Sequence, residues 1–252
     1  MLYLIGIGLK PAQITLEAIE SAKKCGQLFL EGYTSEYAQG SLEELTQMLG
    51  KNVVVLGRKG VEEQFESALL SATSNDIGLL IIGNALTATT HIQLILDAKE
   101  KEIKYKVIPG ISITNTIAET GLDEYKFGRT ITLCYPSEGY SPESFYKQLQ
   151  ENQKVGLHTL CLLDIKKDEK PQRLMNCVEG IEIIEKIAKK KKDKTKFTYI
   201  ALLGMSSERQ KIIAGKKKIL EEKQMLAIYP QTLIITGKLN EKENECLEKL
   251  HK

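Results

Sequence analysis

The chain has few of the side chains on which many catalytic and metal sites depend. Its 252 residues include three histidines and five cysteines, and no two cysteines stand at CxxC spacing. This excludes a zinc site of recognisable spacing, because such sites combine Cys and His ligands in short motifs. No Ser-His-Asp set, carboxylate pair or P-loop pattern is apparent, which argues against hydrolysis and phosphoryl transfer.

Long hydrophobic runs are also absent. The longest, at 77–83, is far below the ~20 residues that span a bilayer. The first residues do not combine a basic segment with a long apolar one, as a signal peptide does. Together with the odd, unpaired set of cysteines, these absences predict a reduced, cytoplasmic protein that does not cross a membrane.

No strong excess of charge marks the chain as a nucleic-acid binder, since its net charge is +2. The charge is unevenly distributed, however. Residues 1–100 contain 7 basic and 12 acidic side chains, and the other 152 contain 28 and 21. The second part could face an acidic partner, although a solvated basic face explains the same numbers.

Short apolar runs alternate with helical patterns in the first 120 residues. We expect strands at 1–7, 27–32, 53–56, 77–82 and 105–108, and helices at 15–25, 41–49, 61–74 and 91–101. Ser41 and Glu44 have capping-box spacing, and Ile92, Ile95 and Leu96 are predicted to face the core from the last helix. This alternation predicts βαβ units and a mainly parallel sheet.

The pattern becomes richer in strands after about residue 120. Strands are expected at 130–135, 158–163, 199–203, 211–214 and 232–235. Helices are expected at 141–153 with Ser141 as N-cap, at 176–190 and at 241–250. The sequence therefore predicts two α/β domains, at 1–120 and 121–252, the second with a mixed sheet.

Three loops that follow strands carry glycines and hydroxyl side chains. They are Gly6-Ile7-Gly8-Leu9-Lys10-Pro11, the segment 83–91 (GNALTATTH) and the segment 107–113 (VIPGISI). Each can also be explained locally, as a tight turn or as a helix capped by Thr89, Thr90 or Ser112. In a parallel sheet, however, the three loops would share the edge at which ligands bind. A dinucleotide fingerprint is rejected, because the third glycine is missing and Pro11 disturbs the turn.

Over nearly its whole length the chain resembles the diphthine synthase family of tetrapyrrole-methylase-like enzymes. The resemblance rests on IGIGL (5–9), GNALTATTH (83–91), VIPGISITN (107–115), EYKFGRTITL (124–133), GLHTLCLLDIK (156–166) and YPQTLIITGK (229–238). It implies two α/β domains of the tetrapyrrole methylase type with the cofactor in the inter-domain cleft, and a homodimer. The implied reaction is methylation of the modified histidine of translation elongation factor 2 in diphthamide biosynthesis.

The same resemblance implies S-adenosyl-L-methionine as methyl donor and S-adenosyl-L-homocysteine as product. Carried over by motif, the cofactor-binding residues are Leu9, Asn84, Thr87, Ser112, Ile113, Leu163, Met205 and Gln231. No metal, membrane or direct nucleic-acid contact is implied. No catalytic side chain is identified, and the number of methyl groups added and esterification of a carboxylate besides the amine remain open.

The chain departs from the family pattern at three places. The family's GDP is Gly83-Asn84-Ala85 here, its HNAS is Pro109-Gly110-Ile111-Ser112, and its histidine before the last strand is Gln231. Losing an acid near a cationic sulfonium could weaken binding by roughly 1–3 kcal/mol. These departures keep two alternatives open: a methyltransferase acting on a corrin or porphyrin precursor, and a non-catalytic S-adenosylmethionine-binding or scaffold protein. The basic segments 186–196 and 216–218 are candidate contacts to the elongation factor.

Overall fold

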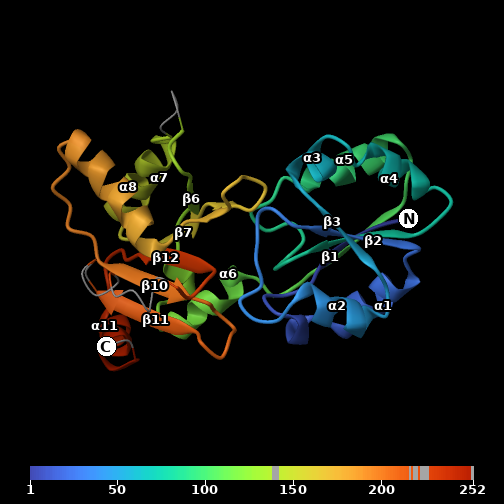
Figure 1. Ribbon diagram of the computed structural model, residues 1–252. Helices are drawn as coiled ribbons and strands as arrows, with labels where there is room; N and C mark the ends of the chain where they lie inside the picture. Colours follow the sequence, from blue (N-terminus) through green and yellow to red (C-terminus); the bar gives the residue numbers. More distant parts are fainter. Residues whose placement is uncertain (138–141, 216, 218–220, 222–226, 251–252) are drawn as a thin grey trace. The chain divides into compact units, whose positions relative to one another are not determined.

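The computed structural model of the protein (Figure 1) describes residues 1–137, 142–215, 217, 221 and 227–250. The chain forms two compact units, each with its own sheet. The first unit contains Met1–Ile113 and Lys166–Gln172, and the second contains Thr114–Ile165 and Arg173–Lys252. The chain thus leaves the first unit at 113, a few residues before the boundary that the sequence suggests near 120.

The first unit is built on a five-stranded parallel sheet, as the strand–helix alternation predicts. Its strand order is β3-β2-β4-β1-β5. The strands are β1 (Leu2–Gly6), β2 (Gln27–Glu31), β3 (Val53–Leu56), β4 (Ile77–Ile81) and β5 (Tyr105–Ile108). All five residues of β4 are buried, because this central strand is covered on both faces.

Helices cover both faces of this sheet (Figure 1). They are η1 (Pro11–Gln13), α1 (Leu16–Lys24), α2 (Leu42–Leu49), α3 (Arg58–Glu62), α4 (Glu66–Ser71) and α5 (Ile92–Glu100). Two apolar clusters fill the layers, one beneath α1 and α2 and one beneath α3, α4 and α5. The Ser41 hydroxyl caps α2 by accepting from the Glu44 N–H at 3.2 Å, which confirms the predicted start.

Two helix predictions in this unit are wrong. The segment 61–74 is not one helix but holds the end of α3 and all of α4. In α5, Ile95 is buried as expected, but Ile92 and Leu96 are 53% and 52% exposed. The buried stripe runs instead through His91, Leu94, Ile95 and Ala98. These positions have helical spacing, and the stripe begins at a histidine that the apolar pattern did not include.

The second unit has a mixed five-stranded sheet of order β11-β10-β12-β7-β6. Among its described strands, β6 and β7 alone pair in parallel, which confirms the mixed sheet expected from the strand-rich pattern. The strands are β6 (Ile131–Leu133), β7 (Thr159–Leu163), β10 (Tyr199–Leu203), β11 (Lys211–Gly215) and β12 (Gln231–Ile235). A separate two-stranded ribbon joins β8 (Ile165–Lys166) to β9 (Arg173–Leu174).

The other helices whose bounds the described residues give are α6 (Ile113–Thr116), η2 (Ile117–Thr120), η3 (Glu124–Lys126), α7 (Ser144–Lys154), α8 (Cys177–Lys190) and α11 (Glu241–Leu250). Apolar side chains of α7 and α8 pack on the mixed sheet in one continuous core. Asn176 and Glu179 form a complete capping box at the start of α8. The predicted N-cap Ser141 lies outside the described residues.

Candidate functional site

Three loops meet at the carboxyl edge of the parallel sheet, as the sequence predicts. The loop after β1 joins the loop after β4 through two backbone hydrogen bonds: Gly8 N–H to Gly83 O at 3.3 Å and Gly83 N–H to Gly8 O at 2.9 Å. The loop after β5 lies against both. A Cβ built on Gly110 would be 2.3 Å from Gly83 O and 2.6 Å from the carbonyl carbon of Gly6. Only glycine therefore allows this junction.

The first unit's five candidate cofactor residues belong to these loops or to the turn that follows them. Leu9 and Ser112 are buried, whereas Asn84, Thr87 and Ile113 are partly exposed. Ser112 and Ile113 stand directly before and at the first position of α6. The structure thus gathers five residues that lie up to 104 positions apart in the sequence.

Asn84, which stands where the family has an aspartate, makes two hydrogen bonds with backbone groups. Its Oδ1 accepts from the Leu86 N–H at 3.1 Å, and its Nδ2 donates to Gly110 O at 3.3 Å. A carboxylate could keep the first of these bonds but has no proton for the second. The amide therefore fastens the β4 loop to the β5 loop, a role that the sequence did not reveal.

The local explanation of the loop after β4, in which Thr89 or Thr90 is the N-cap of the next helix, is wrong. Helix α5 has His91 in the N-cap position, without a capping hydrogen bond from that side chain. The Thr89 hydroxyl accepts weakly from the His91 N–H at 3.4 Å, and the Thr90 hydroxyl donates to Glu62 Oε1 at 3.4 Å. Thr90 is thus turned towards α3 instead of towards the helix that it precedes.

The second unit's three candidate residues also share one sheet edge. Leu163 ends β7, Gln231 begins β12, and Met205 follows the end of β10. The antiparallel register sets Leu203 opposite Gln231 and Leu162 opposite Thr232, so these three strand ends are neighbours. All three side chains are at least nine-tenths buried.

Gln231 replaces the family's histidine and has a clear structural role. Its Oε1 accepts from the Cys177 N–H at 2.8 Å, and its Nε2 donates to Ile228 O at 3.0 Å. The first bond satisfies one of the unpaired N–H groups at the start of α8. The side chain therefore ties the helix start to the sheet edge.

In the part of the chain that the structure describes, one buried polar atom has no hydrogen-bond partner, and it belongs to the loop that bonds to Leu9. Among the described residues, the Tyr37 hydroxyl is the single buried side-chain oxygen or nitrogen without a hydrogen bond. Its neighbour Ala38 donates from its N–H to Leu9 O at 3.0 Å, so this loop is fixed to the first candidate cofactor residue. Leaving such a hydroxyl unpaired costs about 1–3 kcal/mol, which a bound polar group would recover. An isolated tyrosine in a loop gave no sequence signal for this hydroxyl.

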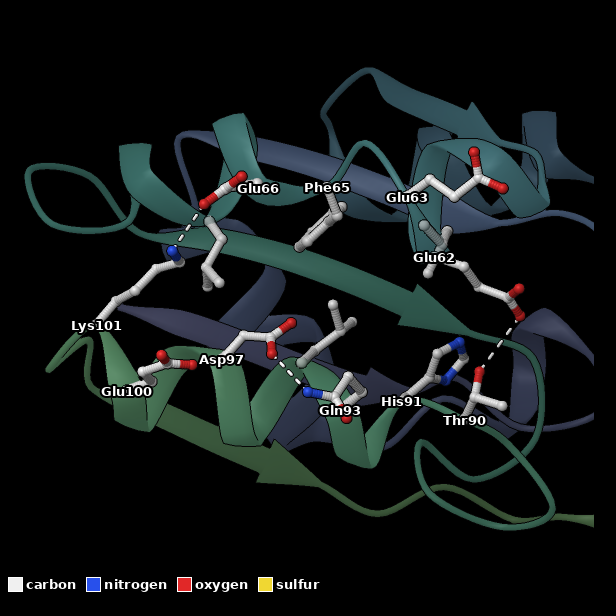
Figure 2. A pocket seen from close by; sticks show the side chains of 13 residues that line it. Glu62, Glu63, Phe65, Glu66, Thr90, His91, Gln93, Asp97, Glu100 and Lys101 are labelled. Carbon is white, nitrogen blue, oxygen red and sulfur yellow. Dashed lines mark hydrogen bonds and ion pairs between the residues drawn. The ribbon is translucent and has the colours of Figure 1, made fainter.

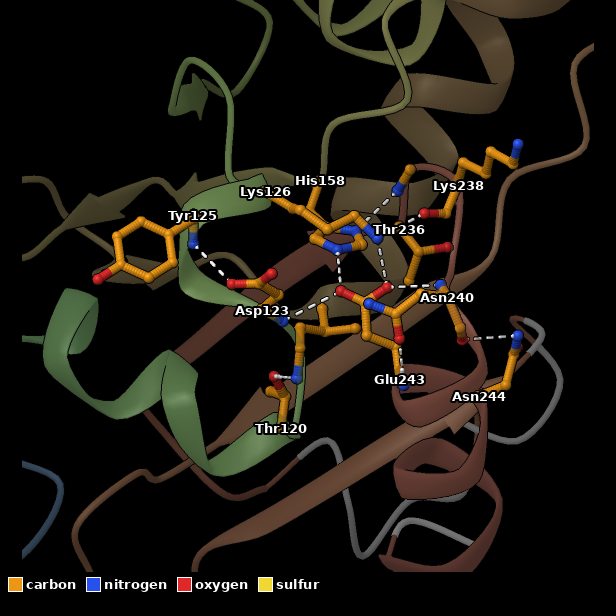
Figure 3. A network of polar contacts seen from close by, with 12 residues as sticks. Thr120, Asp123, Tyr125, Lys126, His158, Thr236, Lys238, Asn240, Glu243 and Asn244 are labelled. Carbon is orange, nitrogen blue, oxygen red and sulfur yellow. Dashed lines mark hydrogen bonds and ion pairs between the residues drawn. The ribbon is translucent and has the colours of Figure 1, made fainter.

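The two buried histidines have different surroundings. His158 Nδ1 accepts from the Gly237 N–H at 2.9 Å, so its proton is on Nε2, which faces Glu243 Oε1 at 2.9 Å (Figure 3). Glu243 also accepts from Lys126 and from the N–H groups of Asp123 and Asn240. Burial alone would raise the pKa of Glu243, but these donors lower it to about 2. With both ring nitrogens occupied, His158 holds α11 in place and does not serve as a base.

His91 lies at the inner wall of an acidic groove between α4 and α5 (Figure 2). Its Nδ1 is 3.3 Å from Ala85 O, and burial lowers its pKa. The groove has a volume of about 500 Å³ and is lined by five carboxylates: Glu62, Glu63, Glu66, Asp97 and Glu100. None of the eight candidate cofactor residues lines it, so the groove is separate from the cofactor edge.

Among the described residues, no group of three or more His, Cys, Asp or Glu side chains is arranged to hold a metal ion. None of the described helices combines the length and apolar composition that crossing a membrane requires.

Comparison with known proteins finds a family match over most of the chain. Residues 1–220 match the model of the tetrapyrrole (corrin/porphyrin) methylases. Diphthine synthase of Methanocaldococcus jannaschii is 36% identical, with 99% of this chain and 98% of that protein aligned. Human diphthine methyl ester synthase is 40% identical over 73% of this chain and 64% of its own length. A crystal structure of a candidate diphthine synthase from Entamoeba histolytica superposes with a TM-score of 0.87 at 31% identity, covering 100% of this chain and 98% of that one.

Proposed function

Because the chain belongs to the diphthine synthase family of tetrapyrrole methylases, we propose that it methylates the modified histidine of translation elongation factor 2 with S-adenosylmethionine. It is a methyltransferase of diphthamide biosynthesis. The observation that carries the proposal is the alignment with the M. jannaschii enzyme over 99% of this chain and 98% of that protein. That alignment includes both sheet edges, whereas the broader methylase match by itself would also suit a tetrapyrrole substrate.

We propose that all eight residues at the two edges contact S-adenosylmethionine. The first edge brings Leu9, Asn84, Thr87 and Ser112 together around a close backbone junction, and a ligand with several polar groups suits the backbone and hydroxyl groups there. The sulfonium supplies an already activated methyl group when it is bound. The protein then has to hold the donor and the accepting atom in line and to keep water out.

The accepting group determines whether a base is needed. An amine must lose its proton before attack, whereas a carboxylate is ionised at pH 7. His158 is committed to Gly237 and Glu243, and His91 lines a separate groove. We therefore assign no general base, and the role of this chain in the transfer is to bind and orient the reactants.

The test is methylation of the factor itself. Purified chain, S-adenosylmethionine and elongation factor 2 carrying the unmethylated intermediate are incubated, and the intact factor is weighed. We expect mass gains in whole methyl units, and no gain on a factor whose histidine is unmodified. No gain, with cofactor binding intact, would contradict the proposal and favour a scaffold or a tetrapyrrole methylase. A corrin precursor in a parallel reaction separates those two.

The lysine-rich segment 186–196 is the part of the second unit that we propose contacts the factor. Lys190 and Lys191 lie 2.6 and 3.4 Å from Glu143, so their charge is partly balanced. In the segment 216–218, Lys217 lies 2.9 Å from Glu182, whereas Lys216 and Lys218 lie outside the described residues. Reversing the charge at Lys192, Lys194 and Lys196 should slow modification of the intact factor, and unchanged kinetics would contradict the contact.

We further propose that the chain acts in the cytoplasm as a homodimer. Ile92 and Leu96 stand one turn apart on α5 and are each about half exposed, which is the kind of surface that a second copy would cover. Light scattering on the purified chain measures the oligomeric state. A mass equal to that of one chain would contradict the dimer.

A further inference from the structure

Arg173, the first residue of β9, lies on an aromatic platform. Its Cζ is 3.7 Å from the centroid of the Tyr135 ring, so the guanidinium stacks on that ring. A stacked guanidinium uses its flat face for the contact and keeps its N–H donors directed outward in its own plane. The contact therefore orients the guanidinium, whose N–H groups form a planar fork, and leaves these N–H groups available for hydrogen bonds.

The platform itself is firmly held. The Tyr135 hydroxyl donates to Glu179 Oε2 at 3.2 Å, and its backbone N–H donates to Asp164 Oδ2 at 3.0 Å. Glu179 Oε2 also accepts from the Asn176 N–H at 2.8 Å, as part of the cap of α8. The carboxylates near the ring are thus already engaged with Tyr135 and with the helix start.

No carboxylate among the described residues balances the charge of Arg173. Within the part of the chain that the structure describes, no Asp or Glu oxygen lies within 4.0 Å of its guanidinium, and the residue is exposed. Arg58, by contrast, lies 3.0 Å from Glu62 and 3.5 Å from Asp168. Arg173 is therefore a positioned cation that can still receive an anion.

Its position relates it to the candidate cofactor edge. Leu133 and Leu163 are opposite each other at the ends of β6 and β7. Asp164 follows Leu163 directly and accepts from the N–H of Tyr135, which lies two residues after Leu133. Through its contact with the Tyr135 ring, Arg173 is thus linked to the residue that follows Leu163, a candidate cofactor residue. Both reactants of the proposed reaction carry a carboxylate next to an amine: the methionine part of the donor and the modified histidine of the factor.

We propose that Arg173 binds this amino-acid carboxylate through its outward N–H groups, and so fixes the reactant that carries it. A guanidinium and a carboxylate match as a planar two-bond pair, which favours Arg over any other residue here. The inference rests on the proposed methyltransferase function, and Arg173 acts as a binding residue. Losing such a charged pair should weaken binding roughly 10–100-fold.

The experiment compares two ligands and one substrate in the full-length chain. Arg173→Met keeps an unbranched side chain that still packs on the Tyr135 ring but removes the charge. Calorimetry measures the affinity for S-adenosylhomocysteine and for 5′-methylthioadenosine, which lacks the amino-acid part. Methylation kinetics give the KM for the intact factor carrying the unmethylated intermediate. Arg173→Lys tests whether the charge without the fork recovers part of the loss.

Two results support the proposal and identify the source of the carboxylate. Weaker binding of S-adenosylhomocysteine with unchanged binding of methylthioadenosine assigns Arg173 to the donor. Unchanged binding of both ligands with a raised KM for the factor assigns it to the substrate. The proposal is overturned when both ligands weaken by the same factor, or when neither affinity nor KM changes.

Arg129→Met is the matched control. Arg129 is exposed like Arg173 but precedes β6, so it lies at the other end of that strand from Tyr135. We expect wild-type affinities and KM from this variant. Should the wild-type chain add no methyl group to the factor, the proposed function fails; a selective loss of S-adenosylhomocysteine binding in Arg173→Met would still support the Arg173 site, and its absence would overturn both.

Discussion

The two sheet edges that hold the candidate cofactor residues are built by different means. In the first unit, three loops contact each other mainly through backbone atoms, with Gly110 pressed against Gly6 and Gly83, and the Asn84 amide adds one side-chain bond. In the second unit, side chains make the connections: Gln231 reaches the start of α8, and Asp164 reaches the Tyr135 N–H. The first edge thus depends chiefly on the absence of a side chain at Gly110, and the second on particular polar side chains.

This difference determines how each edge should respond to substitution. A backbone junction leaves no room to adjust, so an added methyl group forces the loops apart. A side-chain network loses one hydrogen bond at a time, and the cost depends on charge and burial. Substitutions in the two units therefore separate steric from electrostatic dependence.

The largest effect is expected from Gly110→Ala. The added Cβ would lie 2.3 Å from Gly83 O and 2.6 Å from the carbonyl carbon of Gly6, and these backbone atoms cannot move aside independently. We expect a loss of about 3 kcal/mol in the free energy of unfolding, measured by urea denaturation, and a loss of S-adenosylhomocysteine binding.

Gly57→Ala is the control for this substitution. No atom lies within 4 Å of a Cβ at Gly57, and its φ of −77° suits any residue. Because Gly57 is the N-cap of α3, where alanine is less favourable than glycine, this variant should lose at most about 1 kcal/mol. Equal stability of Gly110→Ala and Gly57→Ala would show that the first edge does not depend on close backbone packing.

A smaller, pH-dependent effect is expected from Glu243→Gln in the second unit. The side chain is 2% exposed, and its pKa of about 2 lies below the ordinary value of 4.5. A carboxyl whose pKa is lowered by folding stabilises the folded state above about pH 4.5 and loses that contribution as the pH falls towards 2. The variant should lose about 2 kcal/mol at pH 7 and progressively less below pH 4.5.

Unfolding curves from pH 7 to pH 2.5 measure this dependence. Glu245→Gln serves as the control, because Glu245 pairs with Lys242 and Lys249 at the surface of the same helix, where water screens the charges. The network in Figure 3 would not be the electrostatic support of α11 if the difference between Glu243→Gln and wild type were independent of pH.

The smallest effect, and one of opposite sign, is expected from Tyr37→Phe. Removing the unpaired hydroxyl should raise the stability of the ligand-free chain by up to about 1 kcal/mol. If a bound ligand satisfies this hydroxyl, the variant should also gain less thermal stability from S-adenosylhomocysteine than the wild type does. Tyr125→Phe is the control, since Tyr125 is 96% exposed. Identical melting curves for wild type and Tyr37→Phe, with and without ligand, would contradict the prediction.

The sequence predicted the positions of helices and strands better than it predicted which side of each helix is buried. Strand–helix alternation was sufficient for the parallel sheet, and Ser41 was identified as an N-cap because capping is a local interaction. The prediction of which face of α5 is buried was wrong. Ile92 and Leu96 are apolar, and only the packing shows that they are exposed and that His91 belongs to the buried stripe. Similarly, Thr89 and Thr90 had the right residue type for a cap, but Thr90 bonds to Glu62 on another helix.

The residues by themselves determined the alternation of elements, the glycine-bearing loops and, through the resemblance, the family. Those features depend on local spacing and on segments that stay recognisable in order along the chain. Only the tertiary structure decided what Asn84 and Gln231 do. Asn84 bonds to the backbone of Gly110, 26 positions away, and Gln231 bonds to the backbone of Cys177, 54 positions away. The same holds for Tyr37 and Arg173, because only the arrangement in space shows that neither has a polar side-chain partner among the described residues.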